Sequence, residues 1–569
     1  MRRRWVAVAR GDEPPDLVLA GGMVLSVFSG EVFRADVAVA DGHVVGVGEY
    51  DGPVKRDVSN RYLVPGFIDG HCHIESSKLD VGEFARCVLQ RGTTSVVVDP
   101  HELANVLGTA GVEYVLRASN GLPLGVYVMM PSCVPASAFE SPAETLTAGD
   151  FAELLGRRRV IGIAEMMNYP AVIAGDPAVF DKLALTGFSR IDGHAPALSG
   201  RALNAYLAAG PTSDHECTTL EEAREKLRLG MWIMIREASM IRNLEALLPL
   251  VQQHGTDNCM FVTDDREAGT LLGEGHMNSI VRKATALGLS VADAVKLASL
   301  NVARYHGLEG RGAIAPGYWA DILVLPDLVR FEPEAVLREG RVVVEAGECL
   351  PFDRHPVPDT VRHTVRTAPL ESSSFVVGDR GDTCIRVLDL VPDQVLTRAG
   401  TAQPARAGGR LLADPERDLA KLAVVERHHS TGRVGLGFVR GFGLKQGAFA
   451  STVAHDAHNL VVVGVSDDDM AACVGALSSA GGGLAVARDG RVVGLLPLEI
   501  AGLMSTAPAE EVVNQLEKLE RALRDMGVTL ETPFMYLSFL ALSVIPELRL
   551  TDQGLVDVQR FEIVPLGIS

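Results

Sequence analysis

Eight short apolar runs, each followed by a helix-like stretch or a long loop, constrain the fold of this chain more than any other feature. Parallel strands need crossover connections of a dozen or more residues, and the stretches between these runs are long enough. Eight such alternations over about 250 residues match the size of a (β/α)8 barrel. We therefore predict an α/β protein with a TIM-like barrel over residues 65–311 and strands at 63–68, 94–99, 125–130, 160–165, 189–194, 212–215, 231–237 and 259–264.

A doubly wound parallel sheet is the competing architecture. It would usually carry a glycine-rich phosphate-binding loop after its first strand, and no such loop follows residue 68. The barrel is therefore the favoured prediction.

The segments that flank the predicted barrel are rich in β-forming residues. Short runs in residues 1–64 and 312–360, separated by Gly or Asp-Gly signals, predict strands that join in one small β-sandwich. Residues 352–370 have the composition of a linker, and residues 371–569 predict a C-terminal α+β domain. We also expect a single helix over residues 293–306 and an exposed loop over residues 401–409.

Composition narrows the class of protein. The net charge of −19 argues against a nucleic-acid surface, which would need basic patches. The eight cysteines are scattered and form no Cys-x-x-Cys pair, which excludes a thiolate zinc cluster and suits reduced thiols in the cytoplasm. The apolar run near the N-terminus is too short for a signal peptide, and no run is long enough to span a bilayer, so we predict no membrane association.

Two histidines close the first predicted strand. His71 and His73 stand at positions i and i+2, which project to the same face of a strand, whereas Cys72 points to the other face. Two neutral imidazoles on one side of a strand end can bind a divalent cation. An isolated His-x-His would more often be a polar loop, so the interpretation depends on the later strands.

Further histidines and carboxylates recur at the ends of those strands. Because the carboxyl ends of barrel strands converge at one mouth, we expect these side chains to meet there. Nitrogen and oxygen ligands of this kind suit Zn, Mn or Fe(II), and Glu165 can supply an anion that bridges two cations. Such a pair of cations would activate water, and Asp264 could both bind metal and take a proton from that water. In chain order the strand-end residues are His71, His73, Asp99, His101, Glu102, Glu165, His194, His215, Asp264 and Asp265.

The motifs resemble the amidohydrolase superfamily over nearly the whole chain. They lie at residues 65–77, 98–108, 164–170, 192–200, 212–219 and 453–459. The resemblance implies a metal-dependent barrel with a small β-sandwich, a C-terminal domain, and a two-metal centre for which Mn is favoured and Fe(II) or Zn are alternatives. It also implies a hydrolase that deaminates adenine to hypoxanthine and ammonia in purine salvage. A homo-oligomer, in the form of a dimer, is expected.

The same resemblance assigns roles to individual residues. In the implied reaction, activated water attacks C6 of the purine, Glu165 or Glu102 protonates N1, and Asp264 passes a proton to the departing amine. The implied metal ligands are His71, His73, Glu165, His194, His215 and Asp264. The expected substrate contacts are Asp99, His101, His276, His455 and His458.

Two alternatives remain open. Another hydrolase on the same scaffold, such as a different aminopurine deaminase, a cyclic amidase or a deacetylase, would need the same activated water. Departures from the family pattern at Asn278 and at residues 266–268 bear on substrate fit. A non-catalytic binding protein is disfavoured because all the expected ligands are present.

Overall fold

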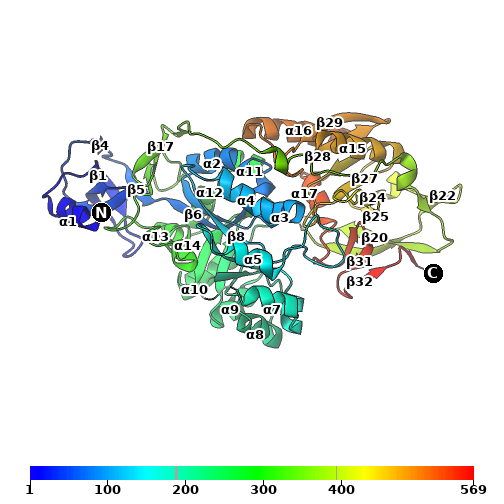
Figure 1. The fold of residues 1–569 in the computed structure, drawn as a ribbon, viewed down its shortest axis with the longest axis horizontal. Helices are drawn as coiled ribbons and strands as arrows, with labels where there is room; N and C mark the ends of the chain where they lie inside the picture. Colours follow the sequence, from blue (N-terminus) through cyan, green and yellow to red (C-terminus); the bar gives the residue numbers. More distant parts are fainter. Residues whose placement is uncertain (186, 188–189, 393, 569) are drawn as a thin grey trace.

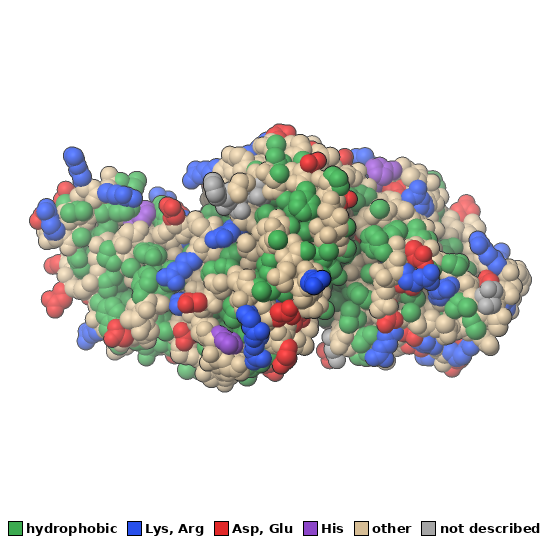
Figure 2. Space-filling model, turned by 90° about the horizontal axis from the view of Figure 1, so that it is seen from below, with side chains coloured by type: hydrophobic (Ala, Val, Ile, Leu, Met, Phe, Trp, Pro, Cys, Tyr) green, Lys and Arg blue, Asp and Glu red, His purple; other side chains and the backbone are tan. Residues whose placement is uncertain are grey.

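The computed structural model describes residues 1–185, 187, 190–392 and 394–568. The molecule is elongated, with the two chain termini toward opposite ends (Figure 1). Parallel strands occupy its middle, and an antiparallel-rich sheet lies on either side of them (Figure 1). Lys and Arg side chains are interspersed with Asp and Glu on the face shown in Figure 2.

The middle segment forms two parallel sheets that together make a TIM-like barrel. A six-stranded sheet has the order β10-β9-β8-β7-β6-β14, and a three-stranded sheet has the order β11-β12-β13. β14 continues β13 after Thr263 and pairs with β6, while the N–H of Thr212 donates to the carbonyl of Ile191 over 3.0 Å between β11 and β10. The strands are β6 (Phe67–His73), β7 (Thr93–Val98), β8 (Gly125–Met130), β9 (Val160–Met166), β10 (Arg190–Gly193), β11 (Ser213–Asp214), β12 (Trp232–Arg236), β13 (Cys259–Val262) and β14 (Asp264–Asp265).

A buried apolar cluster fills the space enclosed by these strands. It takes side chains from six of them, and it also includes Val302 and Tyr305. A packed interior leaves the carboxyl ends of the strands as the place for functional side chains. The strand members of the cluster are Ile68, Val97, Met129, Ala164, Met234, Met260 and Val262.

Helices follow the strands along the chain. α2 begins where the Asp80 carboxylate accepts hydrogen bonds from the N–H groups of Gly82 and Glu83, at 2.6 and 3.1 Å. The helices are α2 (Val81–Gln90), α3 (His101–Leu107), α4 (Thr109–Ala118), α5 (Ala148–Leu154), α6 (Tyr169–Ala174), α7 (Pro177–Leu183), α8 (Gly200–Ala208), α9 (Leu220–Arg228), α10 (Leu244–His254), α11 (Ala268–Gly273), α12 (Met277–Ala286), α13 (Val291–Leu297) and α14 (Leu300–His306).

The first predicted strand, residues 63–68, is wrong as one element. The chain changes partners inside it, because the N–H of Gly66 donates to Asp321 in the flanking sheet and that of Phe67 donates to Gly92 in the barrel. A Cβ at Gly66 would lie 2.4 Å from the Thr94 hydroxyl, so only glycine fits this junction. β5 (Tyr62–Pro65) therefore belongs to the flanking sheet and β6 to the barrel.

Two further elements differ from the bounds that the sequence predicted for them. The single helix predicted over residues 293–306 is wrong: α13 and α14 are separate, and the carbonyl of Ala298 between them accepts a hydrogen bond from Ile68 in the barrel. The predicted start of the fifth strand, Ser189, lies outside the described residues, and β10 begins at Arg190.

The flanking sheet joins segments from both sides of the barrel. β5 and β15 pair in antiparallel register, with Val64 opposite Leu323, so residues before and after the barrel share one nine-stranded sheet. Helix α1 (Arg2–Arg10) packs on β2 and β3. The strands are β1 (Leu17–Leu25), β2 (Val32–Ala40), β3 (His43–Gly48), β4 (Lys55–Asp57), β5, β15 (Ile322–Leu325), β16 (Ala335–Arg338), β17 (Arg341–Glu345) and β18 (Glu348–Cys349).

The C-terminal segment contains a second nine-stranded sheet, packed against helices α15 (Asp467–Ala480), α16 (Ala509–Asp525) and α17 (Pro533–Phe539). The loop predicted over residues 401–409 is wrong as a loop, because β21 ends at Ala402 and β22 (Ala405–Ala407) pairs with β23. The other strands include β20 (Cys384–Leu390), β21 (Thr397–Ala402), β23 (Arg410–Leu412), β24 (Leu419–Val425), β25 (Val434–Arg440), β26 (Ala448–Ser451), β27 (Leu460–Gly464), β28 (Gly483–Arg488) and β29 (Arg491–Pro497). Among the described residues, no helix combines the length and apolar character needed to cross a bilayer.

Candidate metal centre

Six side chains from the strand ends of the barrel meet in one cluster. Five of them are buried, and His194 is only slightly exposed. They come from five different strand ends, which explains how residues far apart in the sequence share one site. The six are His71 and His73 on β6, Glu165 on β9, His194 after β10, His215 after β11 and Asp264 on β14.

His71 and His73 face two carboxylates. Nε2 of His73 lies 3.1 Å from Oδ1 of Asp264 and 3.4 Å from Oε1 of Glu165. Nε2 of His71 lies 3.4 and 3.7 Å from the same two oxygens. His71, His73 and Asp264 form a buried group that could hold one cation, and Glu165 lies beside it.

The other oxygen of Glu165 faces a second pair of imidazoles. Oε2 lies 2.7 Å from Nδ1 of His194 and 3.2 Å from Nε2 of His215. Glu165 therefore presents one oxygen to each histidine pair, which is the arrangement of a carboxylate shared by two cations.

The hydrogen bonds of the histidines indicate which ring nitrogens could bind a cation. Nδ1 of His73 lies 2.9 Å from the carbonyl oxygen of Asp99, which can only accept, so this nitrogen carries the ring proton. Nε2 of His73 is then the nitrogen that faces Glu165 and Asp264, and it could bind a cation when it carries no proton. Nε2 of His71 is buried and has no hydrogen-bond partner among the described residues. Ring nitrogens that converge in this way are suited to bind a metal ion. The residues of this cluster therefore fit the divalent cations that the family resemblance implies.

The electrostatics of the cluster favour ionised carboxylates. Burial alone would raise the pKa of Glu165, but the imidazoles of His215, His194 and His73 outweigh it and hold that pKa well below its usual value. The pKa of Asp264 is also well below its usual value, because Arg236 and the imidazoles outweigh the effect of burial. Both groups are therefore anionic at neutral pH and available as ligands.

Two charged residues of the site had no predicted role. Arg236, at the end of β12, donates hydrogen bonds from Nη1 to Asp264 over 2.7 Å and to Glu216. Glu216 also lies 3.4 Å from Nε2 of His215. One feature of the sequence could have pointed to Arg236. It follows the apolar run Ile233–Ile235 directly, just as Glu165 follows an apolar run.

The predicted substrate residues of the second strand lie beside this cluster. Nδ1 of His101 is 3.2 Å from Oδ2 of Asp99 and 3.7 Å from Oε1 of Glu165. Oδ1 of Asp99 is buried without a hydrogen-bond partner among the described residues. Glu102 lies in the first turn of α3 and is also buried.

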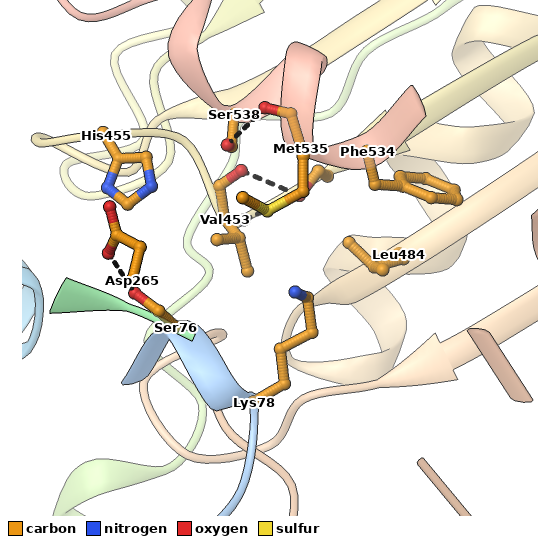
Figure 3. Close-up of a pocket in the computed structure, with 10 residues that line it drawn as sticks. Ser76, Lys78, Asp265, Val453, His455, Leu484, Phe534, Met535 and Ser538 are labelled. Atoms are coloured by element: carbon orange, nitrogen blue, oxygen red, sulfur yellow. Dashed lines mark hydrogen bonds between the residues drawn. The ribbon is translucent and has the colours of Figure 1, made fainter. Parts of the chain in front are cut away.

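The C-terminal domain reaches this part of the site. Nδ1 of His455 lies 3.1 Å from Oε1 of Glu102, and Nε2 of His458 lies 3.9 Å from Oε2. A small pocket opens next to them, between the barrel and the C-terminal domain, and His455 and Asp265 lie on the same side of it (Figure 3). Apolar side chains of the C-terminal segment also line it: Leu484 and Phe534 lie on the far side of the view, with Val453 and Met535 between (Figure 3).

His276 does not join the cluster. Its ring is fully buried, with Nδ1 2.8 Å from the Thr93 hydroxyl and Nε2 3.2 Å from Asp69. The prediction that it contacts substrate is therefore not supported, because both ring nitrogens have partners within the barrel wall. Asn278 accepts the N–H of His276 and donates to the carbonyl of Phe331, so this departure from the family pattern serves the start of α12.

The departure at residues 266–268 is also directed away from the ligands. Arg266 donates to the carbonyl of Glu237 and to the hydroxyl of Ser279, at 3.0 and 2.8 Å. Neither acceptor belongs to the six-residue cluster. The unusual residues therefore leave the geometry of the metal centre as described.

Two family models match the chain. The model described as Amidohydrolase family matches residues 62–343, and the model described as Adenine deaminase C-terminal domain matches residues 394–562. The first match contains the whole six-residue cluster, and the second contains His455 and His458.

Curated relatives match over almost the full length. "Adenine deaminase 2" of Carboxydothermus hydrogenoformans is 48% identical over 565 residues, with 99% of each chain covered. "Adenine deaminase" of Desulfatibacillum aliphaticivorans is also 48% identical with 99% of each chain covered. "Adenine deaminase" of Oleidesulfovibrio alaskensis is 49% identical and covers 99% of this chain and 98% of its own.

Proposed function

The chain belongs to the adenine deaminase family of amidohydrolases, and from that premise we propose that it hydrolyses adenine to hypoxanthine and ammonia. The observation that carries this proposal is the full-length match to adenine deaminases, which spans both the barrel and the C-terminal domain. The buried cluster around Glu165 supplies the chemistry that such a hydrolysis needs.

We propose two cation sites that share Glu165. His71, His73 and Asp264 would hold one cation, and His194 and His215 the other. Manganese is proposed from the family resemblance, with Fe(II) or zinc as alternatives, because imidazoles and carboxylates without a thiolate suit all three cations. When bound, the cations make a water molecule acidic enough to act as a nucleophile near neutral pH.

Asp264 is the residue that we assign to proton transfer. In the reaction, the water oxygen bonds to C6 of adenine, the bond from C6 to the exocyclic nitrogen breaks, and ammonia leaves. The carboxylate of Asp264 is ionised, so it can accept a proton from the attacking water and deliver it to the departing amine. Its hydrogen bond from Arg236 keeps one oxygen occupied and leaves the other toward His71 and His73.

The second proton has to reach the ring nitrogen N1. Glu165 and Glu102 are the two residues assigned to this step, and both have pKa values below the usual range. For both, the nearby imidazoles outweigh burial, which alone would raise the pKa. Neither is a carboxylic acid in the free enzyme. The proton delivered to N1 therefore originates from the attacking water.

Asp99 and His101 are assigned to purine binding, because they line the cluster beside Glu165.

We extend the proposal to the architecture. The barrel is a complete (β/α)8 barrel over residues 65–311, and residues 1–64 and 312–360 form a β-sandwich. Support comes from one apolar cluster that includes Val37 and Val44 near one edge of the flanking sheet and Leu337 toward the other, as expected for a sheet folded over itself. Residues 371–569 form a C-terminal α+β domain.

A cytoplasmic homodimer is proposed for the assembled protein. All eight cysteines are free thiols, which fits a reducing compartment. Light scattering at several protein concentrations would measure the mass of the assembly and test the dimer.

A substrate panel tests the proposed reaction. Protein purified with Mn is offered adenine, adenosine, guanine and isoguanine, and released ammonia is measured. A hydantoin and an N-acetylated amino sugar, followed by ring opening and by acetate release, test the rival hydrolases. The proposal is supported if ammonia is released from adenine much faster than any other substrate reacts. Faster ring opening of the hydantoin, or faster acetate release from the amino sugar, would contradict it.

A further inference from the structure

The C-terminal domain meets the active-site face of the barrel through two pairs of complementary groups. His455 faces Glu102, with Nδ1 3.1 Å from Oε1. The neighbouring residues Asp456 and His101 also pair, because Oδ1 of Asp456 lies 3.7 Å from Nε2 of His101. All four side chains are buried. Charged groups buried in this way are costly unless they are paired, so the two segments depend on one another.

The Glu102 carboxylate has polar neighbours at one oxygen, whereas the other oxygen has no hydrogen-bond partner among the described residues. Its Oε1 lies 3.3 Å from the Ser76 hydroxyl oxygen and faces Nδ1 of His455. Its Oε2 is buried and has no hydrogen-bond partner among the described residues. A buried carboxylate oxygen without a donor is unfavourable, so this atom is suited to receive an N–H group from a ligand.

His458 places a second unused group beside that oxygen. Nδ1 of His458 accepts the N–H of Ala454 over 3.1 Å, so the ring proton is on Nε2. This Nε2–H is buried without a partner among the described residues and lies 3.9 Å from Oε2 of Glu102. An acceptor and a donor side by side match the adjacent N–H and ring nitrogen along an edge of a purine base.

Glu102 is connected to the metal centre through one serine. The Ser76 hydroxyl donates its proton to Oδ1 of Asp265 over 2.5 Å, and Asp265 follows Asp264 directly (Figure 3). We propose that His455 is a positioning residue of the C-terminal domain: it holds Glu102 so that the free carboxylate oxygen accepts an N–H of the purine. This inference rests on the proposed deamination of adenine.

A structural role for His455 is the competing explanation. Its ring stacks on Phe539, with centroids 4.6 Å apart and an angle of 24° between the planes. Two substitutions separate the roles. His455→Asn keeps an N–H at the position of Nδ1 and loses the stacked ring, whereas His455→Phe keeps the ring and loses the donor.

The measurement is the KM and kcat for adenine, together with equilibrium binding of hypoxanthine, which retains the ring N–H groups. Each variant is loaded with Mn, and its metal content and thermal unfolding are compared with those of wild type. We expect His455→Phe to raise KM and the Kd for hypoxanthine about tenfold or more, because a donor to a charged group is lost. His455→Asn keeps both constants within about threefold. Ser76→Ala, which removes the hydroxyl that links Glu102 to Asp265, raises KM in the same direction.

A matched control comes from another histidine at the domain contact. Nε2 of His429 lies 3.1 Å from the carbonyl of Pro142, away from Glu102. His429→Phe is expected to leave KM unchanged. If His455→Phe binds adenine and hypoxanthine like wild type, or if His455→Asn loses as much as His455→Phe, the inference is overturned. If His455→Phe fails to fold, Ser76→Ala becomes the test. A wild-type KM for adenine in Ser76→Ala would then overturn the inference. Wild-type protein that releases no ammonia from adenine would instead contradict the proposed function.

Discussion

Arg236 donates a hydrogen bond to Asp264 over 2.7 Å and so joins the ends of two neighbouring barrel strands at the metal centre. Asp264 has a φ of 58°, in the left-handed region that a non-glycine residue adopts at a cost of about 1–3 kcal/mol. The ion pair and the pairing of Asp264 with Cys72 on β6 hold this conformation. The position of the proposed proton carrier is therefore fixed by contacts on both sides.

Replacement of Asp264 by Asn should abolish proton transfer while leaving the fold intact. The amide cannot accept a proton from water, so we expect kcat for adenine to fall by about 10²- to 10⁴-fold. The comparison is made at matched metal content, measured by elemental analysis. Near-normal turnover of the fully loaded variant would remove the assignment.

Replacement of Arg236 by Lys should lower kcat without loss of metal. Lysine keeps the positive charge but cannot present the planar guanidinium to Asp264 and Glu216 together. We expect a fall in kcat of about tenfold, corresponding to about 1.4 kcal/mol in the barrier. Arg242→Lys is the control, since Arg242 pairs with Glu274 near the surface. A wild-type rate for Arg236→Lys would show that the orientation of Asp264 does not depend on this side chain.

Replacement of Glu165 by Gln should reduce metal binding more than stability. The amide has one neutral oxygen in place of two anionic ones, and only one histidine pair can face that oxygen. We expect elemental analysis to find at most about one cation per chain and no detectable deamination. Full metal occupancy in the variant would contradict a shared carboxylate.

Glu140 makes the stability of the protein dependent on pH. It lies between the barrel and the C-terminal domain, where it accepts hydrogen bonds from the N–H of Ala457 and the hydroxyl of Ser543. Burial, together with the negative charge of Asp456, raises the pKa of Glu140 to about 8. Unfolding exposes the side chain and returns its pKa to about 4.3. Its contribution to the free energy of unfolding is therefore complete below about pH 4 and is lost as the pH rises through about 8.

Urea unfolding of wild type and Glu140→Gln between pH 5 and 8 measures this contribution. The wild-type free energy of unfolding should fall more over this range than that of the variant, because glutamine cannot ionise. Equal pH dependence in the two proteins would show that Glu140 does not keep its proton in the folded state.

Glu165 and Asp264 could be singled out because each closes an apolar run, and strand ends of a barrel share one face. The set of six as metal ligands came from the resemblance to the amidohydrolase superfamily. Arg236 was missed because an arginine is not a metal ligand, and its role depends on two carboxylates that only the fold brings near. His276 is near Asp264 along the chain, but its ring contacts Thr93 and Asp69 in the barrel wall, so its contact with substrate stays a prediction. The split at Gly66 could not be predicted, since it depends on partners at Gly92 and Asp321.

The central claim is that this chain deaminates adenine with two cations held around Glu165. Metal-free protein is titrated with Mn, and ammonia release from adenine is followed at each step. The account predicts negligible activity without metal and a rise that levels off at about two cations per chain, as expected for two ligand sets that share one carboxylate. Full activity in the metal-free protein, or a plateau at one cation per chain, would contradict it.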